Sequence, residues 1–184
     1  MNTGTPITVP VRLDEKTFRR FARFDMFVLR KKWIRPAVFS LILIAFALIA
    51  LLARKEQSGL IAAVLLAVGI GLPVVYIGTF LSQVNMQAVR AKLKPARPVY
   101  TVTLREAGIR VENNRKKEDP LEMDWASVQK AFRRKGCVYL YVTAAKAFLL
   151  PDGQADVPDP DVWRYLEEHL GKEKCRRIFP RQII

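Results

Sequence analysis

The sequence predicts an α+β membrane protein, in which a two-helix transmembrane hairpin is joined to a β-rich domain that a C-terminal helix closes. Two long apolar runs, residues 37–53 and 59–81, contain no ionisable side chain. After residue 99, short segments alternate between apolar and polar residues, as half-buried strands do. Residues 159–171 instead have the apolar spacing of an amphipathic helix.

The two apolar runs have the length of membrane helices. Their 17 and 23 residues would extend over about 25 and 34 Å as α-helices, against an apolar bilayer thickness of about 30 Å. A buried hairpin in a soluble protein would need a large apolar shell, which the charged remainder of the chain does not supply. More than thirty residues precede the first run, which argues against a cleaved signal peptide. We expect both helices in the mature protein.

Flanking charges predict the orientation of this hairpin. Only two basic residues, Arg54 and Lys55, lie in the short connection between the runs. Eight basic residues lie close to its other ends: Arg30, Lys31, Lys32, Arg35, Arg90, Lys92, Lys94 and Arg97. Because basic residues are retained on the cytoplasmic side, we expect both termini in the cytoplasm.

Composition divides the chain into four parts. Residues 1–35 carry a net charge of +6, the hairpin of residues 36–81 a net +1, and residues 82–184 a net +7. Within the last part, residues 82–98 form a juxtamembrane helix and linker, and residues 99–184 form the sheet domain with its final helix. Next to a membrane, such a basic excess favours the anionic inner leaflet over nucleic acid as a partner.

The segment ITVPVRL, residues 7–13, has the strict alternation of a strand. Its apolar face needs a sheet, because a lone strand is not stable in water. The nearest sheet is the one predicted from residues 99–151. We therefore predict that residues 7–13 pair with an edge of that sheet, with Pro10 turned away from the ladder, and that the hairpin is an insertion within one domain.

The next segment predicts an amphipathic basic helix. Asp14 can cap a helix that continues to Trp33. A rotation of 100° per residue gathers Arg19, Arg23 and Arg30 on one side. Such a helix can lie on the inner leaflet, or it can pack on the cytoplasmic domain with its basic face in water. Both alternatives remain open.

Small residues recur every four positions in the second span, at Gly59, Ala63, Ala67 and Gly71. A stripe of small side chains lets another helix approach closely. The partner is either the first span of the same chain, which we favour, or a second copy of the protein. No acidic or basic side chain lies within either span, so a transporter is not indicated.

Residues 99–151 predict five or six short antiparallel strands. Turns are expected around residues 106–108, at Lys135 and Gly136, and near residues 144 and 145. PLEMDW is predicted as a strand with Leu121, Met123 and Trp125 inward. In the C-terminal helix, Asp159 is expected at the cap position and Gly171 at the end.

Two basic segments are candidate binding sites for an anionic head group or an acidic partner. They are Arg115, Lys116 and Lys117 in a polar loop, and Arg133, Arg134 and Lys135 before a turn. We predict no catalytic group: His169 is expected to pack or to face solvent, and the cysteines Cys137 and Cys175 lack metal-binding or redox spacing. No metal and no cofactor are predicted.

Four motifs, GIRVEN, DWASV, CVYLYV and AFLLP, together with the hairpin, resemble the bacterial YcxB-like family over residues 7–151. Members of that family usually have a basic residue after the proline of the last motif, where this chain has Asp152 and Gly153. The resemblance implies a pleckstrin-homology-like cytoplasmic domain in a bacterial plasma membrane, and no reaction.

We expect a membrane-anchored binding or scaffold module that contacts membrane lipids, a protein partner or a second copy of itself. An immunity or stress-protection factor against membrane-active peptides, suggested by its similar architecture, is the alternative. An enzyme is the least favoured class.

Overall fold

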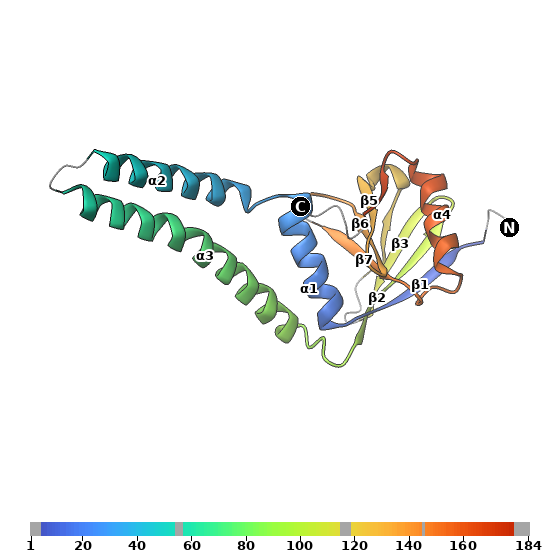
Figure 1. The fold of residues 1–184 in the computed structure, drawn as a ribbon. Coiled ribbons are helices and arrows are strands. Elements are labelled where there is room, and N and C mark those ends of the chain that lie inside the picture. The colour runs from blue at the N-terminus through green and yellow to red at the C-terminus, as the bar shows by residue number, and fades with distance from the viewer. Residues whose placement is uncertain (1–4, 54–56, 115–118, 145, 179–184) are drawn as a thin grey trace. The chain divides into compact units, whose positions relative to one another are not determined.

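The computed structural model describes residues 5–53, 57–114, 119–144 and 146–178. It has a mixed α+β fold with two four-stranded sheets and two helices that are long and apolar enough to cross a membrane (Figure 1). The chain forms two compact units, one of Met1–Phe18 with Lys92–Ile184 and one of Arg19–Ala91. The sheets belong to the first unit and the apolar helices to the second.

The first sheet has the order β1-β2-β3-β4, and all its neighbouring strands are antiparallel. Its strands are β1 (Ile7–Leu13), β2 (Arg97–Arg105), β3 (Gly108–Asn113) and β4 (Leu121–Met123). The predicted pairing of residues 7–13 with the later sheet is confirmed, because Ile7 pairs with Leu104 and Leu13 with Arg97. Both connections to the apolar helices therefore leave this unit side by side, from one end of the sheet.

The second sheet has the order β7-β6-β5-β8. It consists of β5 (Lys130–Arg133), β6 (Cys137–Tyr141), β7 (Ala147–Pro151) and β8 (Cys175–Arg177), and β8 runs parallel to β5. Six strands, β2 to β7, are thus present where five or six were predicted. Positive φ angles of 46° at Lys135 and 80° at Gly136 confirm the turn predicted there. The turn predicted near residues 144 and 145 falls partly outside the described residues.

Helix α4 (Asp159–Leu170) covers the core between the sheets with Val162, Trp163, Tyr165, Leu166 and Leu170, all buried. Residues of both sheets meet it: Val9, Val138, Leu150 and Val162 surround one small internal space. The Tyr100 hydroxyl joins the sheets, because it accepts a hydrogen bond from Leu149 N at 2.7 Å and donates to Leu149 O at 3.1 Å. Burial raises the pKa of this hydroxyl, so it remains protonated.

Three predictions for this unit are wrong in detail. Leu121 does not point inward but is 41% exposed, because β4 is a three-residue edge strand. Trp125 does not end that strand but begins a 3-10 turn (Trp125–Ser127), where its Nε1 donates to the carbonyls of Arg105 and Glu106. The cap position of α4 is occupied by Pro158, while the Asp159 carboxylate accepts a hydrogen bond from Gly153 N at 2.7 Å. Gly171 ends the helix as predicted, with φ of 79°.

The basic helix is interrupted. Asp14 caps α1 (Glu15–Phe24) through Thr17 N, as expected, but a π-helical turn (Asp25–Leu29) follows. This turn breaks the regular rotation of 100° per residue, so Arg30 does not continue the arginine stripe. Its Nε instead pairs with Asp25 Oδ2 at 2.8 Å. Within this unit, Phe27 stacks edge to face on Phe80 of the following apolar helix at 6.1 Å.

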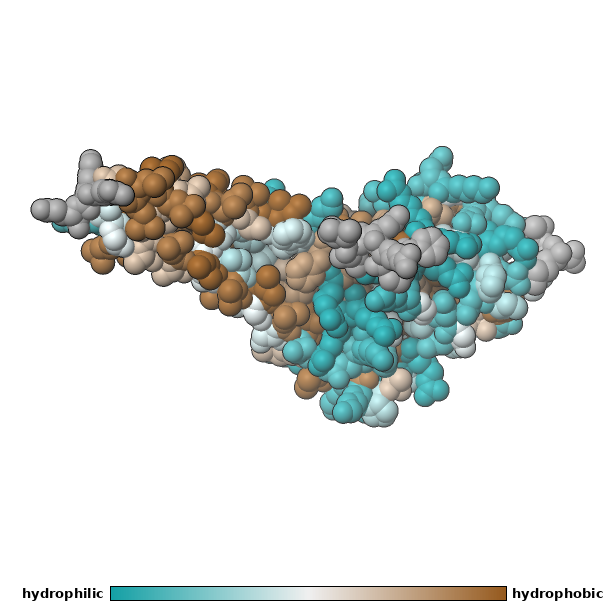
Figure 2. All heavy atoms as spheres, in the orientation of Figure 1, coloured by the Kyte–Doolittle hydropathy of each residue, from teal (hydrophilic) through white to brown (hydrophobic). Residues whose placement is uncertain are grey.

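Helices α2 (Ile34–Leu52) and α3 (Ser58–Arg90) lie antiparallel (Figure 1). Figure 2 shows that apolar side chains cover their visible surface, whereas polar ones predominate over the strands. Helix α3 is about 50 Å long at 1.5 Å per residue, so its last two turns extend past the apolar run. Pro36 lies in the first turn of α2, as expected.

The contact between α2 and α3 does not use the predicted stripe. Nothing lies within 4 Å of a Cβ built at Gly59 or Gly71, and Ala63 and Ala67 are exposed. Ser40 Oγ instead donates to Gly69 O. Ala47 lies seven residues after Ser40 on α2, and Ala62 lies seven residues before Gly69 on the antiparallel α3. Both alanines are fully buried. The small residues that permit close approach are therefore spaced by seven, the period of a helix seam.

This register predicts which substitutions loosen the hairpin. Gly69→Leu should destabilise it by about 2 kcal/mol, because the new side chain would meet Ile44 and Leu43, whose nearest atoms lie 3.3 Å from the added Cβ. Gly71→Leu should have little effect, since its Cβ meets nothing within 4 Å. Thermal unfolding of both variants in detergent tests this. Equal midpoints would contradict the observed register.

Candidate functional site

The second sheet ends in a strongly basic edge. Strand β8 is its outermost strand, and Ala131, Phe132 and Arg133 of β5 pair with Cys175, Arg176 and Arg177. We call residues 130–135 and 172–177 the basic edge. Eight of these twelve residues are basic and only Glu173 is acidic: Lys130, Arg133, Arg134, Lys135, Lys172, Lys174, Arg176 and Arg177. Such a density of like charge on paired strands favours an anionic partner.

The two arginines of β8 point to opposite faces of the sheet, because side chains alternate along a strand. Arg177 lies over the ring of Trp163, with its guanidinium carbon 5.5 Å from the ring centroid. Cys175 shares that face, and its thiol contacts the Leu166 carbonyl of α4. Arg176 points to the other face, and both arginines are exposed. Cationic groups are thus available on both sides of one edge.

Arg133 holds the fold together and is not free to bind. Its Nη2 lies 3.3 Å from Asp152 Oδ2 in a half-buried ion pair, and its Nη1 donates to Asp159 O at 3.3 Å. Burial raises the pKa of Asp152, and the charge of Arg133 opposes that shift. Of the predicted site residues, Arg133 therefore links β5 to the start of α4.

Lys135 is at the tip of the hairpin between β5 and β6. Its φ of 46°, followed by 80° at Gly136, is the left-handed backbone of a tight hairpin turn. Reciprocal backbone hydrogen bonds between Arg134 and Cys137 close this turn, at 3.0 and 3.2 Å. Asparagine or glycine is usual at the Lys135 position, because a longer side chain costs about 1 kcal/mol there. The exposed Lys135 therefore has a backbone conformation that is unfavourable for a residue with a long side chain.

In the first sheet, the outer edge of β1 is closed by hydrogen bonds from the same chain. The Asp156 carboxylate accepts a hydrogen bond from Thr8 N at 3.0 Å, and Asp156 N donates to Thr8 O. The Gln154 amide both accepts from Arg12 N at 2.7 Å and donates to Arg12 O at 2.9 Å. Pro10, between them, has no N–H to satisfy and faces this edge, as predicted. The outward backbone groups of Thr8 and Arg12 on β1 are thus occupied by residues of the same chain.

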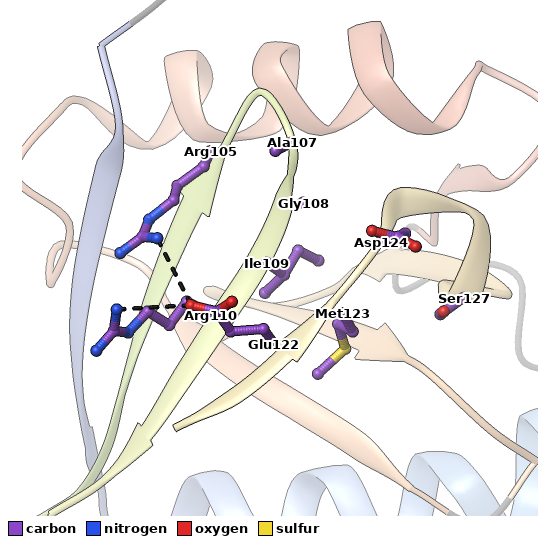
Figure 3. A pocket seen from close by; sticks show the side chains of 9 residues that line it. All are labelled: Arg105, Ala107, Gly108, Ile109, Arg110, Glu122, Met123, Asp124 and Ser127. Carbon is purple, nitrogen blue, oxygen red and sulfur yellow. Dashed lines mark ion pairs between the residues drawn. The ribbon is translucent and has the colours of Figure 1, made fainter. Parts of the chain in front are cut away.

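A shallow groove of about 350 Å³ lies on the first sheet, beside the turn between β2 and β3 (Figure 3). Glu122 reaches between two arginines there, with Oε1 3.8 Å from Arg105 Nη1 and 3.5 Å from Arg110 Nη1. Arg110 Nε also lies 2.8 Å from Glu112 Oε1. Carboxylates of the same sheet therefore neutralise the cationic groups of this groove, which makes it a weaker anion site than the basic edge.

Both cysteines are buried, and His169 is packed among aromatic side chains. Burial raises the pKa of the Cys137 thiol to about 12 and that of Cys175 to about 11, so both are protonated near neutral pH. His169 stacks on Tyr165 at 4.2 Å and on Trp125 at 4.8 Å. Its Nδ1 lies 2.9 Å from the Tyr165 carbonyl, within its own helix. These contacts give the histidine a packing role.

Of the other predicted binding residues, Arg19, Arg23 and Arg30 belong to the second unit. Arg115, Lys116 and Lys117 lie outside the described residues. Arg23 Nε donates to the Arg19 carbonyl at 3.4 Å, and Arg30 is paired with Asp25. Within the first unit, the structure adds residues 172–177 to the predicted group at 133–135. The signal for them was the run KEKCRR, but nothing in the sequence indicates that it lies beside β5.

No family model, curated protein or solved structure matches the chain. The function is therefore inferred from the fold and from the basic edge.

Proposed function

We propose that the protein is a membrane-anchored binding module whose basic edge binds an anionic partner. The pairing of two basic segments on adjacent strands, β5 and β8, carries this proposal. Eight cationic side chains within twelve residues create a stronger positive potential than the three cations at residues 115–117. Within the described chain, Lys130, Lys135, Lys172 and Arg176 have no acidic partner.

The hairpin of α2 and α3 serves as the anchor in a bacterial plasma membrane, with both termini in the cytoplasm. The excess of eight basic residues over two supports this orientation. The hairpin is inserted between the paired strands β1 and β2, so two adjacent chain segments tether the sheet unit. A double tether keeps the module close to the membrane, where its effective concentration toward membrane-bound partners is high.

The module is a pleckstrin-homology-like domain of the YcxB-like type. Four antiparallel strands, then three more, then a helix support this assignment. Strand β8 and the inserted hairpin are additions to the pleckstrin-homology-like plan, and the hairpin is part of the resemblance to the YcxB-like family. The protonated thiols and the packed histidine support binding over catalysis.

Neutralising the exposed cations tests the proposal. We expect the double variant Lys135→Gln, Arg176→Gln to lose at least one lipid or protein that co-purifies with the wild type from native membranes. Mass spectrometry of both preparations measures this, with Arg12→Gln plus Lys146→Gln as a variant of equal charge on other strands and loops. An unchanged set of bound molecules in the first variant would show that the basic edge is not the binding surface.

A further inference from the structure

We propose that the outer edge of β8 accepts an acidic, extended segment of another protein, which adds to the second sheet as a further strand. This inference rests on the proposed function and names the partner of its basic edge. Acidic side chains of the added segment would alternate toward Arg176 on one face and Arg177 on the other. Backbone hydrogen bonds to β8 would fix the segment.

The backbone of β8 has donors and acceptors to offer. Ala131 N donates to Lys174 O at 2.9 Å, and Ile178 N donates to Arg133 O at 2.9 Å. Because backbone groups alternate in direction along a strand, the N–H and C=O groups of Cys175 and Arg177 point away from β5. In the described part of the chain, no hydrogen bond from another residue reaches them. An unpaired row of this kind is a template for strand addition.

The two outer edges of the strands β1 and β8 differ sharply. Asp156 and Gln154 occupy the outward backbone groups of Thr8 and Arg12 on β1, and Pro10 between them has no N–H to offer an incoming strand. On β8 the two exposed side chains, Arg176 and Arg177, are instead both basic. Charge on an edge prevents a second copy of the protein from pairing there, because its β8 carries the same charges. The same charges attract a strand of opposite sign.

The geometry favours a protein segment over the lipid surface. The guanidinium groups of Arg176 and Arg177 lie on opposite faces of the sheet, and Arg177 is held over Trp163. A flat leaflet meets one face of a strand, whereas an added strand presents side chains to both. Lys135 adds a further exposed cation, in the turn that follows β5.

The test uses the full chain in phosphatidylcholine nanodiscs and a fluorescent peptide of glutamate and threonine, followed by anisotropy. We expect saturable binding that Arg176→Glu weakens by about tenfold. Arg12→Glu changes the net charge equally on β1 and should alter the affinity by less than about twofold. A peptide of the same charge with alternate backbone nitrogens methylated should lose about tenfold in affinity.

Lys135→Asn separates binding from folding. Asparagine suits the left-handed turn, so the variant should unfold at a higher temperature than the wild type. It should nevertheless bind the peptide about threefold more weakly, because a cation is lost. A purely structural role for Lys135 would not produce these opposite changes.

Three results would overturn the inference. Equal binding of the methylated peptide would show attraction by charge alone, without strand pairing. Unchanged binding by Arg176→Glu would place the peptide elsewhere. Failure of the peptide to bind, while the protein binds phosphatidylglycerol nanodiscs through the same residues, would make the leaflet the partner; the proposed function would survive that result.

Discussion

Deletion of residues 1–13 should unfold the sheet unit and leave the apolar helices α2 and α3 folded. Strand β1 buries Ile7, Val9, Val11 and Leu13, which are 0 to 6% exposed. At about 1.5 to 3 kcal/mol for each fully buried side chain, the deletion removes about 6 to 12 kcal/mol. A domain of this size is stable by only about 5 to 15 kcal/mol. The loss is therefore comparable with the entire stability of the unit.

Hydrogen exchange of the full chain in nanodiscs measures this effect. Amides of β2 and β3 should lose their protection in the deleted protein, whereas those of α2 and α3 should keep it. Deletion of residues 1–4 alone is the matched control and should change neither set. If β2 remains as protected without residues 1–13 as with them, the hairpin is not an insertion within a single folding unit.

The sequence predicted this insertion because its cause is local. Four apolar residues at alternate positions need a sheet, and only one other part of the chain has strands to offer. Antiparallel pairing with β2 and the closure of the β1 edge by Asp156 and Gln154 could not be predicted. Both depend on residues far along the chain, in β2 and at Gln154 and Asp156, whose approach no local pattern records.

The hairpin shows a different limit of prediction. Length and composition predicted two helices, because the number of apolar residues in a run is a local property. Which face of a helix meets its neighbour depends on the register of two elements. A stripe at Gly59, Ala63, Ala67 and Gly71 and a pair at Ala62 and Gly69 are equally good sequence patterns for close approach. The hydrogen bond from Ser40 to Gly69 and the burial of Ala62 distinguish them.

Of the basic edge, residues 133–135 were predicted and residues 172–177 were not, because their pairing again depends on the register of two elements. Arg133, Arg134 and Lys135 stand out as a run of charge, and so does KEKCRR. The parallel pairing of β5 with β8 requires the chain to cross over through α4, and neither run contains a signal for it. Arg133 stood out as a binding residue from its charge alone, yet its ion pair with Asp152 gives it a structural role.

Replacement of Gly108 by alanine should be the most damaging single substitution in the sheet unit. Gly108 has φ of 150°, a backbone conformation that side chains rarely adopt. A Cβ built there would lie 2.3 Å from Met123 O, which is backbone and cannot turn aside. Strand β4 would have to leave β3, with the loss of its backbone pairing. We expect a loss of about 4 kcal/mol from strain and lost pairing together.

Gly136→Ala is the matched control for Gly108→Ala. Gly136 also has a positive φ, of 80°, but nothing lies within 4 Å of the added Cβ. This variant therefore has the backbone strain without the clash and should lose only about 1 kcal/mol. Thermal unfolding in nanodiscs, followed by hydrogen exchange of β3 and β4, compares the two. Equal losses would show that the approach of Met123 to Gly108 does not matter; a much larger loss in Gly108→Ala, with β4 unprotected, would show that close backbone contact holds this edge of the first sheet.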